Sequence, residues 1–384
     1  MITFYITHKG IGGVQNLFLN LTKELYKRDI RVKFIYFKET WLIVELNKEG
    51  VEYELFDLEY DNRKLISNFI NKDDVIILTP ESFIIEEIYQ IKPYFLFWIV
   101  HPKTFIRKLF PVKKIIFKLM IEMIIKRGGL YFMDKTCLED ISKYFRLTVN
   151  ENYLPIPVFG IEKTNSSNLK SLIEKKNRDI ISLSYIGRAV IWKVNPVKKL
   201  ISDLLIIKKT VEKEFTLHIF TDNVVEFEQL LSYNSNEIEL IYHSNIFGAE
   251  LDQFIKKEIL INFAMGTSCL ESAKLGIPSI LVDCSYEAFP SSYKYNWIYN
   301  SEGYSLGKVL DKNYISMNGY KLLEIFNQIF QNDSFICDIS ISCLEYTSKN
   351  HHLESITSLL LEKIVRCNNK ITPNIRHSFS LLRK

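Results

Sequence analysis

The sequence predicts an α/β protein with two doubly wound parallel sheets, one in each half of the chain. Apolar runs of strand length alternate with segments of helical periodicity from the first residue onward. The alternation stops near Leu154–Pro157 and begins again at Ile180. A length of 384 residues suits two domains of ordinary size. A β-α-β order in each half predicts parallel strands with helices on both faces of the sheet.

The first half of the chain opens with a strand over Ile2–Thr7 and a glycine-bearing loop. Apolar residues then recur at helical spacing from Val14 to Leu25, with polar residues on the other face. A second helix is expected over Thr40–Lys48, and Gly50 ends it. Further buried-type strands are expected at Arg31–Phe37, Val51–Phe56, Val75–Thr79 and Tyr94–Val100.

The second half of the chain repeats this rhythm. It begins with a strand over Ile180–Ile186 and a helix over Pro196–Val211. A later helix over Thr267–Leu275 is ended by Gly276, a residue common at helix C-termini. The other strands are expected at Phe215–Phe220, Ile238–Tyr242, Ile259–Phe263 and Pro278–Asp283, and the other helices at Val225–Leu231, Leu251–Lys257, Ser316–Gln331 and Leu353–Arg366.

These patterns divide the chain into five segments. Residues 1–160 are expected to form one Rossmann-like domain and residues 179–345 a second, joined by a polar linker over 161–178. A C-terminal helix is expected over 346–366 and a loose basic tail over 367–384. The two domains are expected to face each other across a cleft. Ligands of doubly wound sheets bind at the carboxyl ends of the strands, so the chemistry is expected in the loops after each strand.

Composition and charge exclude several classes of protein. An apolar share of 47% and a charged share of 24% are typical of a globular chain and not of a disordered one. The net charge is only +4 and no nucleic-acid-binding motif is visible, so nucleic acid is not expected as a partner. The six cysteines form no C-x-x-C pair, and neither a secretory signal nor a membrane span is visible. A cytoplasmic location is therefore expected.

The segment from Phe263 to Pro278 carries the strongest chemical signal. A strand ends there, Gly266 lets a ligand approach the backbone closely, and Thr267 and Ser268 open a helix. Free N–H groups at a helix start, together with two hydroxyls, favour an anion. Glu271 follows one turn later, where its carboxylate could accept hydrogen bonds from a ribose diol. An ordinary helix N-cap explains the Thr-Ser pair taken alone.

The same segment resembles the nucleotide-binding segment of GT-B glycosyltransferases of family 4, which has the pattern E-x-F-G-x-x-x-x-E-A-x-A-x-G-x-P. The resemblance implies that Glu271 holds the ribose of a sugar donor. It also implies that the amides of Gly266, Thr267 and Ser268 meet the donor diphosphate. The residues that match the pattern in register are Gly266, Glu271, Gly276 and Pro278.

Four positions depart from that pattern. Phe263 stands where the family has its first Glu, which touches hydroxyls of the donor sugar, so this chain lacks that carboxylate. The Phe of the pattern is replaced by Met265, and its two alanines by Ser272 and Lys274. The Met-Gly-Thr-Ser variant is similar to a branch found among bacterial surface-polysaccharide transferases.

A second motif follows the strand Ile180–Ile186. Gly187 and Arg188 come directly after the strand, and Lys193 lies five residues further on. They resemble the G-R-x-x-x-x-K motif of the same family, whose Arg and Lys neutralise the donor pyrophosphate. A leaving nucleoside diphosphate needs fixed cations, and the chain has no D-x-D motif for a divalent ion. We therefore expect no metal and no cofactor, with a nucleotide sugar as substrate. The alternative for Arg188 and Lys193 is an ordinary basic loop exposed to solvent.

The acceptor side is expected in the first half. Gly12 and Gly13, in a Gly-Gly-Val-Gln run, resemble the G-G-x-E/Q loop of the family, whose backbone faces the diphosphate and the acceptor. His101 ends a strand, where family members carry a His in a similar place, and it could bond the transferring sugar or polarise the acceptor. A tight glycine turn and a loop-capping histidine explain the same residues.

Residues 103–127 are locally basic, with Glu122 as their one acidic residue. A basic helix with a wide apolar surface suits the headgroup layer of an anionic membrane and an acceptor linked to polyprenyl pyrophosphate. A core helix with a solvated basic stripe is the alternative. The basic residues are Lys103, Arg107, Lys108, Lys113, Lys114, Lys118, Lys126 and Arg127.

Together these features predict a glycosyltransferase of the hexosyltransferase type, peripheral on the inner face of the plasma membrane. It would move a sugar from a nucleotide-diphosphate donor to a growing, lipid-linked bacterial surface glycan of the O-antigen or capsule type. The resemblance to family 4 implies retention of the anomeric configuration. Two alternatives remain: a nucleotide-sugar epimerase of the same architecture, and a non-catalytic subunit that binds a nucleotide sugar.

Overall fold

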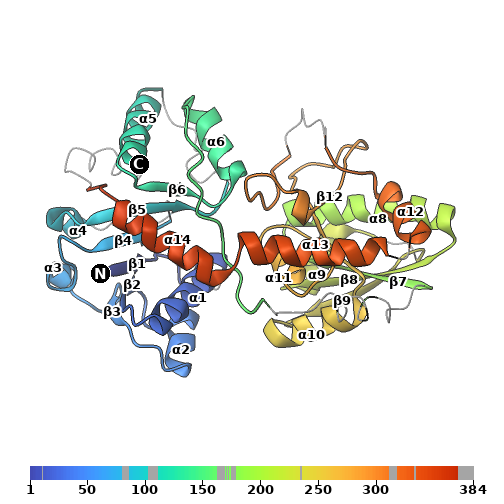
Figure 1. Ribbon diagram of the computed structural model, residues 1–384, viewed down its shortest axis with the longest axis horizontal. Helices are drawn as coiled ribbons and strands as arrows, with labels where there is room; N and C mark the ends of the chain where they lie inside the picture. The colour runs from blue at the N-terminus through green and yellow to red at the C-terminus, as the bar shows by residue number, and fades with distance from the viewer. Residues whose placement is uncertain are drawn as a thin grey trace. The chain divides into compact units, whose positions relative to one another are not determined.

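The structure is a computed structural model that describes residues 1–10, 12–79, 86–102, 111–161, 169, 171, 173, 179–233, 236–310, 318–332 and 334–370. The chain consists of two compact units. One is Met1–Phe159 together with the chain from Leu353 onward, and the other is Gly160–His352. Among the described residues, each unit contains one six-stranded sheet (Figure 1).

The sheet of the first unit has the strand order β3-β2-β1-β4-β5-β6, and its described strands pair in parallel. The order reverses between β1 and β4, and doubly wound sheets bind ligands at such a reversal. Nearly all strand residues are buried, as expected for a sheet covered on both faces. The strands are β1 (Ile2–Tyr5), β2 (Val32–Tyr36), β3 (Glu54–Asp57), β4 (Val75–Leu78), β5 (Tyr94–Ile99) and β6 (Leu130–Phe132).

The helices of the first unit bury apolar faces against this sheet. In α1 (Gly13–Lys27), Leu17 and Phe18 are buried, and the Phe18 ring stacks on Phe4 of β1 with centroids 4.6 Å apart. The helix α14 (Leu353–Arg366) packs against α1. The remaining helices are α2 (Trp41–Lys48), η1 (Arg63–Leu65), α3 (Ile66–Phe69), α4 (Glu86–Ile91), α5 (Pro111–Lys126) and α6 (Lys135–Phe145).

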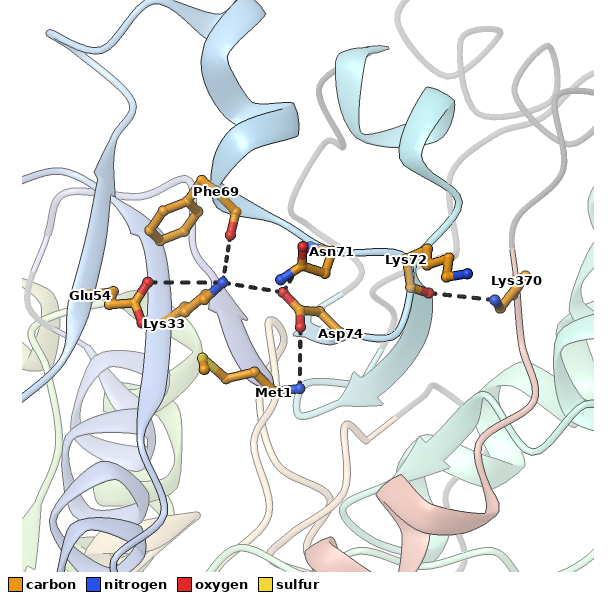
Figure 2. A network of polar contacts seen from close by, with 8 residues as sticks. All are labelled: Met1, Lys33, Glu54, Phe69, Asn71, Lys72, Asp74 and Lys370. Carbon is orange, nitrogen blue, oxygen red and sulfur yellow. Dashed lines mark hydrogen bonds and ion pairs between the residues drawn. The ribbon is translucent and has the colours of Figure 1, made fainter.

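A buried ion-pair network joins the amino-terminal ends of β1, β2 and β4 (Figure 2). Lys33 of β2 donates to the carbonyl of Phe69 at 2.5 Å, and its Nζ lies 3.4 Å from Oδ2 of Asp74 and 3.8 Å from Glu54. The amino group of Met1 lies 3.2 Å from Oδ1 of Asp74. Lys33 and Asp74 are 4% and 2% exposed, and charges buried to this degree persist only when they are paired. The network is therefore structural, and it lies at the sheet edge opposite the carboxyl ends of the strands.

The end of the chain returns to the first unit. Residues 346–366, expected as one C-terminal helix, are divided between α13 (Phe335–Asn350) and α14, with the boundary of the two units falling at His352. The expected loose tail is ordered at its start, because Asn369 is buried against β5. The Phe95 N–H donates to the Asn369 carbonyl at 2.9 Å, and Nδ2 of Asn369 donates to the Phe95 carbonyl at 3.0 Å. Residues 371–384 lie outside the described residues.

The sheet of the second unit has the strand order β12-β11-β10-β7-β8-β9. Its strands are parallel except for β12, which runs antiparallel to β11. The order reverses between β7 and β10, and doubly wound sheets bind ligands at the carboxyl ends of the strands at such a reversal. The strands are β7 (Ile180–Ile186), β8 (Glu214–Thr221), β9 (Glu239–Ser244), β10 (Ile261–Ala264), β11 (Ser279–Leu281) and β12 (Asn296–Trp297).

The first helix after β7, α8 (Ile191–Val211), begins five residues before the expected start at Pro196. A proline inside a helix cannot donate to the carbonyl four residues earlier. Here that carbonyl, of Trp192, accepts a hydrogen bond from the Ser285 N–H at 3.3 Å, so the helix tolerates the proline. The other helices are α9 (Val224–Leu231), α10 (Gly248–Glu258), α11 (Thr267–Ala273), η2 (Ile298–Asn300), α12 (Leu322–Gln331) and α13.

Candidate functional site

Two of the sequence motifs meet at the carboxyl edge of the second sheet. Strands β7 and β10 are parallel neighbours, and Ile186 at the end of β7 pairs with Ala264 at the end of β10. The segment from Gly187 follows the first strand and the segment from Met265 follows the second, so they lie about 5 Å apart, one strand spacing. The strand order reverses between these strands, which is where a doubly wound sheet leaves room for a ligand.

The turn after β7 requires glycine at position 187. A Cβ there would lie 2.7 Å from Cε1 of Tyr185, closer than any real contact. The Tyr185 ring is fully buried and its hydroxyl donates to the carbonyl of Lys193 at 2.6 Å, so it cannot move aside. The Ala189 N–H donates to Oδ1 of Asp222 at 2.8 Å and holds the other side of the turn. Arg188 is left exposed at the strand end.

Lys193 lies in the first turn of α8, half-buried, with its Nζ 5.3 Å from the centre of the Trp192 ring. Burial and the positive charge of Arg188 together lower the pKa of Lys193 to about 8, while Cys284 and Asp222 oppose the shift. The charges of Arg188 and Lys193 repel each other when no ligand is bound. A bound polyanion would offset this repulsion, so the pair favours a polyanionic ligand.

The turn after β10 exposes backbone to a ligand. Gly266 has φ +67° and ψ −147°, a conformation that side chains rarely adopt, and its N–H donates to the Leu306 carbonyl at 2.8 Å. No atom lies within 4 Å of the position a Cβ would take, so the space before it is open. Thr267 is exposed and Ser268 half-buried where α11 begins. The first N–H groups of a helix have no partner within the helix, so this turn can donate to anionic oxygens.

Glu271 lies one turn further along α11, and a buried lysine holds it. The Nζ of Lys274 contacts Oε2 of Glu271 and lies 3.6 Å from Oδ2 of Asp252 on α10. Burial raises the pKa of Glu271, and the charge of Lys274 opposes that rise. Sequence reasoning noted Lys274 only as a departure from a pattern. The spacing of three residues from Glu271 signals the pair, but Asp252 comes from another helix and only the fold brings it in.

Phe263 belongs to the core and not to the site surface. It lies in β10 with no exposed side-chain area, and its ring meets that of Tyr295 edge-on at 6.0 Å. A buried ring in the sheet cannot replace a carboxylate that contacts a sugar. Sugar contacts at this strand end would have to come from the following turn.

The candidates of the first unit lie at the carboxyl edge of the other sheet. Gly12 precedes α1 as its N-cap, and Gly13 is the first helical residue. Gln15 is buried and donates from Nε2 to the His8 carbonyl at 3.1 Å. His101 follows β5, is exposed, and places Nδ1 2.5 Å from the Pro102 carbonyl. Because β4 separates β1 from β5, the strand ends that precede the Gly12 loop and His101 lie about 10 Å apart, two strand spacings.

The described residues contain no group of three or more His, Cys, Asp or Glu side chains placed to hold a metal ion. In the part of the chain that the structure describes, no helix combines the length and the apolar character that crossing a membrane requires.

No protein-family model matches the sequence, and no curated protein matches it. Solved structures do match over both units. A glycosyltransferase from Rickettsia africae has 14% sequence identity, with 94% of this chain and 97% of that chain covered and a TM-score of 0.62. HepE from Anabaena, in complex with UDP and glucose, has 12% identity, coverage of 95% and 99%, and a TM-score of 0.58.

A third match is WaaG, a glycosyltransferase involved in lipopolysaccharide biosynthesis, with 12% identity, coverage of 95% and 99%, and a TM-score of 0.54. At these identities the similarity establishes the fold. The chain has the GT-B type of fold, with two Rossmann-like units, and this confirms the expected fold class.

Proposed function

We propose that this chain is a glycosyltransferase that takes a sugar from a nucleoside-diphosphate donor bound at the carboxyl edge of the second sheet. The observation that carries the proposal is the meeting of two motifs at adjacent strand ends, β7 with β10, at the reversal of strand order. Each motif alone has an ordinary explanation, a solvated basic loop or a helix N-cap. Their position together on neighbouring strands, at a reversal of strand order, favours a shared anion-binding site. The fold shared with glycosyltransferases supports the same conclusion.

The residues of this edge have distinct roles in the proposal. Arg188 and Lys193 balance the charge that develops on the diphosphate as it leaves, a task that needs fixed cations. The Gly266 N–H is already used by the Leu306 carbonyl, which corrects the expected role of that amide. The N–H groups of Thr267 and Ser268 would bind the same phosphates, and Glu271 accepts hydrogen bonds from the ribose. Transfer by these residues alone would be metal-independent, with no cofactor beyond the sugar nucleotide itself.

The acceptor half of the proposal concerns a growing bacterial surface glycan of the O-antigen or capsule type, carried on a polyprenyl pyrophosphate. The Gly12–Gly13 loop and His101 would meet the acceptor, and the product would retain the anomeric configuration of the donor. WaaG, which shares the fold, is involved in lipopolysaccharide biosynthesis. The cytoplasmic side of the membrane is where such donors and acceptors would meet.

A donor screen tests this function. Thermal unfolding is recorded with UDP, GDP, CDP and dTDP, each alone and as its sugar conjugate, because a ligand of the folded state raises the midpoint by mass action. UDP is the first ligand to test, since the HepE structure contains UDP and glucose. The proposal requires stabilisation by at least one donor and transfer to an acceptor extract. Stabilisation by none of them would refute it.

The pH dependence of donor binding should report Lys193. Its pKa is about 8, so raising the pH from 7 to 8.5 deprotonates most of it and should weaken donor affinity by about threefold to fourfold. Affinity falls as the pH rises because the protonated ammonium is the form that binds phosphate. Titration calorimetry at both pH values measures the change. Lys193→Arg stays charged and should remove the dependence; an equal dependence in both proteins would mean that Lys193 does not contact the donor.

A second candidate function is a non-catalytic subunit that binds a nucleotide sugar. The burial of Phe263 favours it, since the usual sugar-contacting carboxylate is absent. An enzyme would release nucleoside diphosphate when donor and acceptor are mixed, whereas a sensor or partner subunit would bind the donor and release none. An epimerase would convert the donor sugar without any acceptor, and that result would replace the transferase proposal.

Membrane contact through α5 is also part of the proposal. The buried face of this helix is apolar and packs in the core of the first unit through Phe117, Met120 and Ile121. On the other side Ile115 and Leu119, four residues apart, are 62% and 60% exposed. Exposed apolar residues at this spacing, with lysines beside them, suit an anionic headgroup layer.

Not every lysine of α5 faces solvent freely. The Lys114 ammonium lies 4.2 Å from the centre of the Tyr144 ring on α6, and Lys118 donates to the Arg146 carbonyl at 3.2 Å. Part of the basic stripe therefore joins α5 to α6, as the core-helix alternative expects. Residues 103–110 of the basic stretch lie outside the described residues.

Removing the exposed apolar pair should release the protein from anionic vesicles. We expect Ile115→Ser with Leu119→Ser to lower binding to phosphatidylglycerol vesicles by about tenfold or more, because each buried aliphatic side chain contributes about 1.5–3 kcal/mol. Flotation of vesicles with bound protein measures this. The matched control is Val365→Ser, since Val365 is 85% exposed on α14. Unchanged flotation of the double variant would leave α5 as a core helix only.

A further inference from the structure

Lys274 is almost fully buried beside Glu271, the residue proposed to bind the ribose, and it has no role of its own in the proposed chemistry. The Lys274 side chain is 10% exposed and lies between α10 and α11. Its Nζ contacts Oε2 of Glu271 and lies 3.6 Å from Oδ2 of Asp252. Its chain neighbour Leu275 packs in a buried apolar cluster with Ile255 of α10. The ammonium is therefore fixed in place and not a mobile surface charge.

The electrostatics of this group are those of two carboxylates that share one cation. Burial and the charge of Asp252 both raise the pKa of Glu271, and Lys274 opposes them. Burial disfavours the charge on Lys274, but Glu271 and Asp252 outweigh it and raise the pKa of the ammonium. Among the described residues, Lys274 from its own helix and Asp252 from α10 are the charged groups that act on Glu271. Removal of the lysine would leave two half-buried acids near each other without a cation between them.

This arrangement bears on recognition because only an ionised carboxylate is purely an acceptor. A ribose diol donates two hydrogen bonds, and a protonated carboxyl would present one donor in place of an acceptor. Lys274 holds one oxygen of Glu271, while the side chain of Glu271 keeps 35% of its surface exposed. The Glu271 side chain is thus held in one orientation by Lys274 and remains partly open to a ligand.

We propose that Lys274, itself held by Asp252, is a positioning residue for the nucleoside part of the donor, because it keeps Glu271 ionised and aimed at the ribose hydroxyls. This inference rests on the proposed function, since it assumes a ribonucleotide at this strand end. Lys274 acts through Glu271 and makes no contact with the ligand.

The test compares UDP with 2′-deoxy-UDP in Lys274→Met at pH 6 and pH 8 by titration calorimetry. We expect the variant to lose on the order of tenfold in UDP affinity at pH 6, the effect of one charged hydrogen bond, and to lose less for 2′-deoxy-UDP. In this variant the ratio of UDP affinity to 2′-deoxy-UDP affinity should be higher at pH 8 than at pH 6, because loss of the lysine raises the pKa of Glu271. Lys274→Arg should keep the wild-type ratio of the two affinities at both pH values. Lys257→Met, at a lysine 82% exposed on α10, is the matched control.

The outcomes separate this inference from the proposed function. Wild-type protein that binds UDP, together with a folded Lys274→Met that keeps the same UDP to 2′-deoxy-UDP ratio at both pH values, overturns the role of Lys274 alone. Wild-type protein that binds no nucleoside diphosphate overturns both. If Lys274→Met does not fold, Asp252→Asn carries the test, because it leaves the Lys274–Glu271 pair in place. Asp252 holds Lys274 but raises the pKa of Glu271, so this variant should lower the ratio by a smaller factor and equally at pH 6 and pH 8. An unchanged ratio overturns the proposal.

Discussion

Arg188→Ala should lower the rate of sugar transfer by on the order of 10²–10³, the loss seen when a fixed donor to a developing negative charge is removed. Arg188 is exposed at the end of β7, and the turn that carries it is held by Gly187, Tyr185 and Asp222. Its removal therefore leaves the turn intact and takes away only the guanidinium. Steady-state release of nucleoside diphosphate measures the change.

The controls for Arg188 distinguish charge from geometry. Arg188→Lys keeps the charge but cannot bind two phosphate oxygens at once, so its rate should fall between those of the wild type and the alanine variant. Lys198→Ala removes an exposed cation from the same helix that holds Lys193 and should change the rate little. Thermal midpoints of all three should agree within a few degrees. A rate for Arg188→Ala equal to that of Lys198→Ala would remove Arg188 from the site.

Removal of the chain after His352 should unfold the first unit, although the cut lies more than two hundred residues beyond Phe132, the last residue of its sheet. The lost segment contributes Leu353, Ile356 and Leu360, which are buried, and Asn369, which pairs with the backbone of β5. Truncation of one buried leucine to alanine alone costs about 2–5 kcal/mol, and a domain is stable by only about 5–15 kcal/mol. Hydrogen exchange of α1 and β5, read by mass spectrometry, should show loss of protection there.

A pair of point variants on α14 tests the same contact without truncation. Leu360→Ala, at a fully buried residue, should destabilise the protein by about 2–5 kcal/mol. Val365→Ala, at a residue 85% exposed, should stay within about 0.5 kcal/mol of wild type. Urea unfolding provides both values. Equal free energies of unfolding for the two variants would mean that α14 contributes little to the stability of the first unit.

Much of the fold was predictable because it depends on local properties of the chain. Continuous apolar runs mark buried parallel strands, and the 3.6-residue period marks helices that cover them. The expected strands agree in existence and type with β1 to β5 and β7 to β11, whereas β6 and β12 were not expected. The helix α6 was not anticipated, although Asp134 caps its start by accepting from the Cys137 N–H at 2.8 Å. An Asp at this position is an N-cap signal that the sequence itself contains.

The candidate donor site was predictable in part for the same reason. Gly187 and Gly266 are read from the sequence because close backbone approach and positive φ demand glycine, and each follows a strand. That the two turns are neighbours is not local, since 78 residues separate the bonded partners Ser184 and Asn262 on their strands. Strand order decides it, and strand order follows from how helices and strands pack.

The sequence alone thus determined the α/β class, the two halves and the residue types at the strand ends, because periodicity and glycine chemistry act within a few residues of each other. Only the tertiary structure decided that α14 belongs to the first unit, that Asp252 completes the Lys274–Glu271 group, and that Phe263 is core. Each of these depends on side chains distant in sequence filling one space. Close packing selects such partners by shape and charge, and no local pattern in the chain records them.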